Sequence, residues 1–196
     1  MHRYPFSGAD NAKVTLEVVE IEASSQENTA VKPSPVSLEL GGKEWREVAG
    51  SEEYYLVRAG WWADGSIMAQ VMNRAQSFLQ LLRFNVVGGA REVLLEERCS
   101  PHCRWLNLHD MLHPLTPTWR PKRRTEDIHP ADFYFLWASS RSGFPQVYLY
   151  RFDSLKGVGV CQNNLLPLGS DGSPVNWSVD RYHCHLFFLV RIIHKC

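Results

Sequence analysis

Few residues of this chain have the types and the spacing that catalysis requires. A nucleophilic serine in the pattern G-x-S-x-G lies on a strained turn between a strand and a helix, beside the backbone N–H groups that stabilise an oxyanion. The chain has no such pattern, and Gly169–Ser173 (GSDGS) has the wrong spacing. Acyl transfer needs a nucleophile, a base and oxyanion donors together. The sequence therefore predicts no catalytic residue in this chain.

The adjacent pair His109 and Asp110 is the best candidate for a binding site. A neutral imidazole offers one hydrogen-bond donor and one acceptor, which suits contact with a peptide backbone. A polar turn at the edge of a sheet would account for the same two residues. From the residue types alone the turn is the favoured interpretation.

Cysteine and histidine suggest a second kind of site. Cys99 and Cys103 flank His102, and His183–His185 (HCH) with Cys196 could supply further zinc ligands. Structural zinc sites use four ligands at regular spacing, and the second set here is irregular, so we expect no metal and no other cofactor. The number of cysteines is odd, five, without a regular framework. That favours reduced thiols and a cytoplasmic location.

Composition argues against charged or membranous partners. The 196 residues include 21 basic and 21 acidic side chains, so no long-range field would attract nucleic acid or an anionic membrane. Arg120–Arg124 (RPKRR) could be a nucleic-acid or nuclear-import patch, but a solvated loop is the favoured interpretation. The apolar run Leu186–Ile193 is interrupted by Arg191 and is far shorter than the ~20 residues of a membrane helix. We expect no membrane segment and no signal peptide.

Short alternating or aromatic runs, separated by turn residues, recur along the chain. Strands at ~8–12-residue spacing are typical of all-β sandwiches, barrels and propellers. Ala63–Gly65 and Gly88–Gly89 are turn signals between neighbouring runs. The predicted strands are Val14–Ile21, Val36–Leu40, Tyr54–Trp61, Ser66–Met72, Phe78–Phe84, Arg91–Glu97, Trp105–His109, Phe133–Ser139 and Val147–Phe152.

A weak internal repeat sharpens the fold prediction. Leu79–Asn85 (LQLLRFN) aligns with Val147–Asp153 (VYLYRFD); each follows a polar turn that contains arginine and precedes a turn that contains glycine. Repeats of this kind point to propeller blades, which are four-stranded sheets of ~40–50 residues. We therefore predict an all-β partial β-propeller of roughly three to four four-stranded blades, some incomplete, too few to close a circle of ~4–8 blades easily.

Longer stretches resemble one family, the dipeptidyl peptidase IV family of serine exopeptidases, in its N-terminal propeller region. HRYPFSGADNAKVTLEVVEI resembles its Y-P-x-x-G-x-x-N-x-K-V element, and Glu53–Asn85 its Y-L-x-R-x-G-W and N/D-R-x-Q-x-x-L-Q stretches. WLNLHDMLHPL is similar to W-I-N-x-H-D-x-F-H-P, and FYFLWASSRSGFPQVYLY to F-I-W-A-S-E-x-T-G-F-R-H-L-Y. The branch that it resembles most is that of the cytosolic dipeptidyl peptidases eight and nine and their plant relatives.

The chain also departs from this pattern. Pro145–Gln146 replaces the family's Arg-His pair, Cys99–Cys103 looks inserted, and the match stops beyond Asp180. We expect residues 1–180 to be a partial propeller domain and residues 181–196 a divergent tail, mis-spliced or truncated.

The resemblance implies a function. In the whole enzyme the propeller gates access for peptides with a free N-terminus, from which an α/β-hydrolase domain releases dipeptides. His109 and Asp110 would help to shape the substrate pocket. The expected partners are these peptides, the hydrolase domain and, in the full-length enzyme, a second subunit. We expect the chain alone to be inactive as a peptidase. The alternative is a noncatalytic propeller-like module that binds peptides or proteins.

Overall fold

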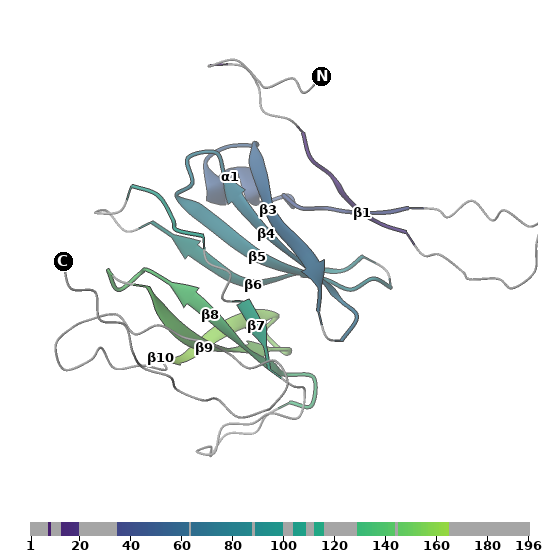
Figure 1. Cartoon of the computed structure of the whole chain (residues 1–196). Coiled ribbons are helices and arrows are strands. Elements are labelled where there is room, and N and C mark those ends of the chain that lie inside the picture. The colour runs from purple at the N-terminus through teal and green to yellow at the C-terminus, as the bar shows by residue number, and fades with distance from the viewer. Residues whose placement is uncertain are drawn as a thin grey trace, which may run out of the picture. The chain divides into compact units, whose positions relative to one another are not determined.

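The structure is a computed structural model that describes residues 8, 13–19, 35–62, 64–87, 89–99, 104–108, 112–115, 129–143 and 145–164. The chain divides into two compact units, Met1–Cys99 with Cys103–Trp105, and Ser100–His102 with Leu106–Cys196. Strands dominate both units, as predicted (Figure 1). No helix in the described part of the chain is long and apolar enough to cross a membrane.

The first unit contains a four-stranded antiparallel meander. Its strands are β3 (Tyr54–Trp61), β4 (Ile67–Asn73), β5 (Phe78–Phe84) and β6 (Arg91–Arg98), which lie side by side in chain order. The predicted turn at Ala63–Gly65 falls between β3 and β4, where the N–H of Trp62 donates to the carbonyl of Ser66. We call this meander the first blade.

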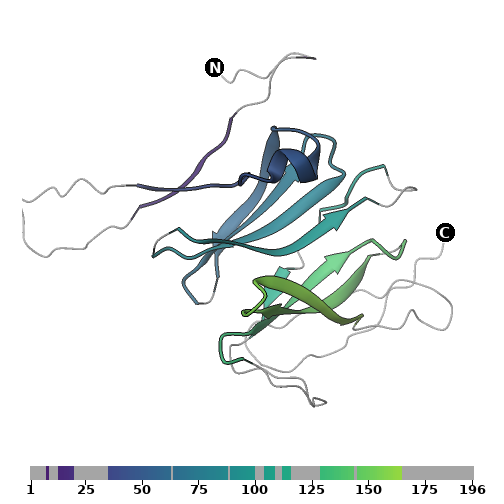
Figure 2. The ribbon, with the colours of Figure 1, turned by 180° about the vertical axis from the view of Figure 1, so that it is seen from behind.

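A ribbon and a short helix cover one face of the first blade. The ribbon pairs β1 (Leu16–Val18) with β2 (Val36–Leu38), and the helix is α1 (Trp45–Ala49) (Figure 2). Alternate residues of a strand point to one face, and those of β4 and β5 meet side chains of the ribbon and the helix in a single core. That core contains Val18, Leu38, Leu40, Trp45, Ala49, Ile67, Ala69, Val71, Phe78, Leu82 and Phe84.

The second unit contains a meander of the same design. Its strands are β7 (Leu112–Pro114), β8 (Phe133–Ser139), β9 (Gln146–Asp153) and β10 (Val158–Asn164), again antiparallel and in chain order. Stacked rings bridge β8 and β9: the centroids of Phe133 and Phe152 are 4.9 Å apart, and those of Phe135 and Tyr150 are 5.3 Å apart. We call this meander the second blade.

The internal repeat is confirmed as a structural repeat. Val147–Asp153 lies within β9, and Leu79–Asn85 covers β5 from its second residue and the residue that follows it, so both copies occupy the third strand of their blades. The described residues thus hold two four-stranded blades and one two-stranded ribbon, which is an all-β partial propeller. Residues 181–196 lie outside the described part.

Three local predictions differ from the structure. Trp105–His109 was expected as a strand, but residues 104–108 are irregular and β7 begins only at Leu112. Trp105 and Leu108 are exposed, so the apolar alternation there does not mark a buried strand face. Strand β10 was not predicted, because VGVCQNN is weakly apolar, and α1 is too short to give a helical period.

Candidate functional site

The pair His109 and Asp110 lies outside the described residues. The structure describes the residues on both sides of it. Residues 104–108 precede it without regular structure, and β7, which pairs with β8, follows it. The expectation that this pair helps to form a substrate pocket therefore remains a prediction.

The described residues instead show a charged cluster at equivalent places in the two blades. In the first blade it is centred on Arg83 of β5. Its guanidinium donates to Asp64 Oδ2 at 2.6 Å and to Glu92 Oε2 at 2.7 Å, and its Nε donates to Ser66 Oγ at 3.0 Å. Asp64 belongs to the turn that leads into β4. The cluster therefore ties the third strand to the start of the second strand.

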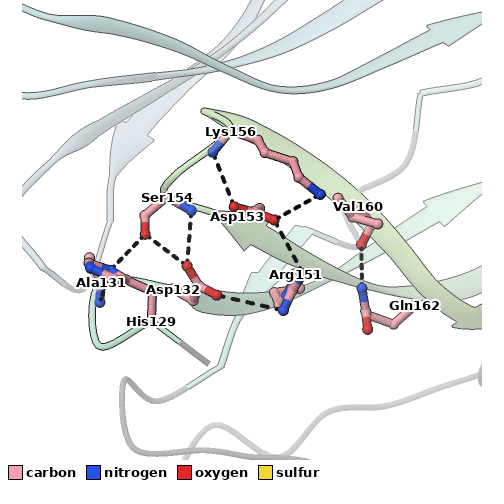
Figure 3. A network of polar contacts seen from close by, with 9 residues as sticks. All are labelled: His129, Ala131, Asp132, Arg151, Asp153, Ser154, Lys156, Val160 and Gln162. Atoms are coloured by element: carbon pink, nitrogen blue, oxygen red, sulfur yellow. Dashed lines mark hydrogen bonds and ion pairs between the residues drawn. The ribbon is translucent and has the colours of Figure 1, made fainter. Parts of the chain in front are cut away.

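In the second blade the equivalent arginine is Arg151 of β9. Its guanidinium lies 3.7 Å from Asp132 Oδ2 and 3.3 Å from Asp153 Oδ2 (Figure 3). Asp132 directly precedes β8, and Asp64 lies three residues before Ile67, the first residue of β4. Lys156 adds a contact of 3.6 Å with Asp153 from the surface. The same clamp, an arginine of the third strand on an aspartate before the second, thus occurs twice.

The turns after the two third strands also match. In the first blade the N–H of Gly89 donates to the carbonyl of Asn85, and in the second the N–H of Gly157 donates to the carbonyl of Asp153. Both glycines have φ near 66°, which L side chains rarely adopt. Asn85 and Asp153 also accept a backbone N–H through Oδ1, from Val87 and Lys156 respectively.

Electrostatics agree with a structural role for these clusters. Burial alone would raise the pKa of Asp64, but hydrogen bonds from Ser66 and the Arg83 guanidinium outweigh it, so the pKa is lowered. Burial likewise opposes the charge of Asp153, while the Lys156 N–H and the charges of Lys156 and Arg151 lower its pKa. Both carboxylates are thus held ionised by their neighbours, as in an ion-pair network.

One part of the second cluster contains the residue types of a catalytic triad. Ser154 Oγ lies 2.8 Å from Asp132 Oδ1 and 2.9 Å from His129 Nδ1 (Figure 3). In a Ser-His-Asp triad the imidazole stands between the other two groups, so that it can take the serine proton while the carboxylate orients it. Here the serine hydroxyl stands in the middle.

This order has a chemical consequence. When Ser154 donates its hydrogen to Asp132, the imidazole cannot withdraw that hydrogen as a base. The N–H of Ser154 also donates to Asp132 Oδ1, at 2.9 Å. Asp132 itself follows a turn closed by its own N–H on the carbonyl of His129. The group therefore fastens the turn after β9 to the residues before β8, and it is not arranged for acyl transfer.

A hollow in the first unit is a further candidate. It has a volume of about 530 Å³ and lies among the ribbon, α1 and the start of β3. Leu38, Leu40 and Trp45 on its wall are buried, and Lys43, Arg46, Glu39 and Glu52 provide charges of both signs. The mixed charges favour no single class of ligand.

The structure describes only some of the cysteine and histidine residues that the sequence suggested as zinc ligands. Among the residues that the structure describes, no group of three or more His, Cys, Asp or Glu side chains could hold a metal ion. The other zinc candidates of the sequence lie outside those residues. Cys99 is disulfide-bonded, which differs from the expected reduced thiols, whereas Cys161 is a free, exposed thiol. An Nη atom of Arg141 lies 3.5 Å from the sulfur of Cys161.

The fold and these clusters define a class of protein: the described part of the chain is built from β-propeller blades, and each blade has an arginine clamp and a glycine turn. Residues 1–183 match the family described as the dipeptidyl peptidase IV (DPP IV) N-terminal region. The chain belongs to this family.

A relative in the honeybee, Apis mellifera, supports the same assignment at greater distance. Venom dipeptidyl peptidase 4 is 29% identical over 111 residues, which is 57% of this chain. The aligned stretch spans 12% of the length of that relative.

Proposed function

We propose that this chain is the propeller portion of a serine-type dipeptidyl peptidase, which releases N-terminal dipeptides from peptides. The observation that carries the proposal is the match of residues 1–183 to the family, together with two blades of one design. In the proposed enzyme the blades gate and shape the access of substrates. The hydrolysis itself belongs to an α/β-hydrolase domain, and a second subunit is a further expected partner.

Within this proposal, His109 and Asp110 form part of the substrate pocket wall. The imidazole would exchange hydrogen bonds with a peptide backbone. Residues that bind ground and transition states alike change KM more than kcat. In the whole enzyme, His109→Ala should therefore raise KM for a Gly-Pro reporter while kcat changes little. An equal loss in kcat at unchanged KM would contradict the assignment.

The main test compares two polypeptides. The transcript is sequenced beyond the codon for Asp180, and both its complete reading frame and the 196-residue chain are purified and assayed with a chromogenic Gly-Pro substrate. We expect hydrolysis by the complete product and none by the 196-residue chain. Hydrolysis by the 196-residue chain that is lost in Ser154→Ala would assign catalysis to the second blade. An inactive complete product would contradict the proposal.

A cytoplasmic location is part of the same proposal, because the chain resembles the cytosolic branch. The disulfide at Cys99 argues in the opposite direction, since disulfides are rare in reducing compartments. Labelling of thiols in protein taken directly from its native source decides between the two. Labelling of Cys99 before reduction supports the cytoplasm, and labelling only after reduction contradicts it.

The noncatalytic alternative has one observation in its favour. The ribbon of β1 and β2 has two strands where each blade has four. An incomplete sheet offers a strand edge to a partner.

A further inference from the structure

The hollow among the ribbon, α1 and the start of β3 has the features of a site for a small ligand. Its volume of about 530 Å³ falls within the range of ~300–1,000 Å³ of small-molecule pockets. Its wall is apolar where Leu38, Leu40 and Trp45 lie, and these three side chains are at most 3% exposed. Such pockets combine an apolar lining with a few polar groups that orient the ligand. The polar groups on the wall therefore decide which ligand fits.

Counted together, the four charged side chains on the wall favour no class of ligand, but they differ in their partners. Arg46 and Glu52 neutralise each other in an ion pair of 2.8 Å. Glu39 and Lys43 are exposed, and neither makes a hydrogen bond or an ion pair within the part of the chain that the structure describes. One negative and one positive group are thus left for a ligand that carries both charges.

Two hydroxyls line the same hollow. The side chains of Thr15 and Ser37 make no hydrogen bond among the described residues. The hydroxyl of Tyr54, by contrast, already donates to the carbonyl of Val14, at 3.2 Å. A hydroxyl both donates and accepts a hydrogen bond. The two side chains can therefore serve the N–H and the C=O of one peptide group in a ligand.

The segment that carries the two unpaired charges is held in place before any ligand binds. Gly42 has a φ of 62°, and a Cβ there would lie 2.9 Å from an Nη atom of Arg91. Arg91 is itself fixed, because it donates to Gln80 Oε1 at 2.8 Å. A Cβ on Gly41 would lie 3.3 Å from Tyr54 Cε1. Because this backbone packs closely on both neighbours, a ligand loses little affinity to the ordering of the wall.

Arg91 does not neutralise the carboxylate of Glu39. Burial lowers the pKa of Arg91, and the charges of Glu39, Glu44 and Glu96 only partly offset this effect. Three carboxylates thus act on one guanidinium without a direct ion pair to it among the described residues. The Glu39 carboxylate keeps its hydrogen-bonding positions open for a cationic group.

We propose that this hollow binds a dipeptide with two free termini and an apolar side chain. The ammonium group of the dipeptide contacts Glu39, and its carboxylate contacts Lys43. Its peptide group faces the hydroxyls of Thr15 and Ser37, and its apolar side chain covers the buried part of the wall. A single amino acid would leave both hydroxyls unused. The proposal does not rest on the proposed peptidase function, because it concerns binding without hydrolysis.

The test titrates the full 196-residue chain with Ala-Leu and follows the backbone amides of Gly41 and Gly42 by NMR. At about 0.3 kcal/mol for each of its roughly 14 non-hydrogen atoms, this ligand should bind with a Kd of about 1 mM. N-acetyl-Ala-Leu lacks the ammonium group, and Ala-Leu amide lacks the carboxylate. Each should bind about fivefold more weakly, because one exposed ion pair is lost. Free leucine should also bind at least about fivefold more weakly, since it has no peptide group.

Variants assign each end of the ligand to its side chain. Glu39→Gln should weaken Ala-Leu about fivefold but leave N-acetyl-Ala-Leu unchanged, because that ligand has already lost the group that Glu39 contacts. Lys43→Met should weaken Ala-Leu equally and leave Ala-Leu amide unchanged. Glu47→Gln and Lys156→Met are matched controls at exposed positions outside the hollow, and they should bind like the wild type. Because all four residues are exposed, the melting temperatures should not change.

Three results would overturn the proposal. The first is the absence of any shift at Gly41 and Gly42 with about 20 mM Ala-Leu, well above the expected Kd. The second is equal binding of Ala-Leu and its two blocked forms, or variants that weaken all three ligands alike. The third is binding of free leucine as tight as that of Ala-Leu, since the peptide group then contributes nothing. None of these results bears on hydrolysis by the complete enzyme, so the two proposals fail separately.

Discussion

Both blades contain an arginine clamp, but the two clamps differ in how exposed their side chains are. Arg83 in the first blade makes short contacts with two carboxylates, but its side chain is 21% exposed and those of Asp64 and Glu92 are 33% and 36% exposed. Arg151 in the second blade makes longer contacts, but it is 11% exposed and Asp132 only 3%. The clamp therefore occupies the same position in both blades. Its contribution to the free energy of unfolding is expected to depend on how deeply its charged groups are buried.

The largest expected effect comes from removing the arginine of each clamp. Breaking a buried ion pair from one side leaves an uncompensated charge, which costs about 3–5 kcal/mol, whereas exposed pairs contribute about 0–1 kcal/mol. Arg151→Met should therefore lower the free energy of unfolding by several times more than Arg83→Met. Urea unfolding followed by circular dichroism measures both.

Arg46→Met is a matched control for this pair of variants. Arg46 forms a contact of 2.8 Å with Glu52, and both side chains are more than 70% exposed. Its loss should change stability by less than about 0.5 kcal/mol. If Arg83→Met proves as costly as Arg151→Met, the short contacts of the first clamp matter more than burial and the comparison is wrong.

The second effect tests whether the two glycine turns are equivalent. Forcing an L side chain into the left-handed region costs about 1–2 kcal/mol. A Cβ at Gly157 would meet no atom within 4 Å, and one at Gly89 would meet only Val36, at 3.9 Å. Gly89→Ala and Gly157→Ala should therefore lose similar stability, from backbone strain alone. Thermal melts of both variants measure the loss of stability, with Gly60→Ala as a control because Gly60 has an ordinary φ. A loss in only one of the two blades would show that the two turns are not equivalent.

The third effect concerns pH. Asp64 has a lowered pKa in the folded state, so its contribution to stability is present above the pKa of the unfolded chain, about 3.9, and is lost as the pH falls through the folded value. In Asp64→Asn the decrease in unfolding free energy between about pH 6 and pH 3 should be smaller than in the wild type. Urea titrations at the two pH values provide the measurement. An unchanged slope would show that the Asp64 carboxylate gains nothing from its ion pair with Arg83.

The smallest effect is expected at Lys156. Its amine approaches Asp153 to 3.6 Å but is 70% exposed. Lys156→Ala should change stability by no more than about 0.5 kcal/mol, because surface pairs are screened by water and salt. A larger loss would mean that the exposed amine of Lys156 stabilises Asp153 as much as the buried guanidinium of Arg151 does.

Sequence reasoning recovered what depends on local alternation. The bounds of β3, β5 and β8 agree with the predicted runs, and the Arg-Phe-Asn/Asp repeat led to the correct unit of structure. It failed where the alternation of apolar residues in the sequence does not match the burial of their side chains in the structure. Trp105 and Leu108 are apolar but exposed, and β10 is a strand with few apolar residues, held by its pairing with β9.

The polar clusters could not be predicted in the same way. Asp132 and Ser154 are separated by 22 residues, and only the pairing of β8 with β9 brings them together. The one available signal was that both repeat copies carry an arginine before Phe84 or Phe152. An arginine at the same place in two strands that are mostly apolar indicates a shared kind of partner, and that partner is the aspartate ahead of the second strand.

The clamps bear on how such a protein can change over evolutionary time. The connection from β3 to β4 comprises residues 62–66, and that from β7 to β8 comprises residues 115–132. Both deliver an aspartate to the arginine of the third strand. In each connection the aspartate lies within the last three residues before the second strand. The clamp therefore depends only on those residues, and we expect insertions earlier in the connection to leave it intact. If the segment that encodes such a blade is duplicated, the new blade carries its own arginine and aspartate. The connections of the two blades can then change in length independently.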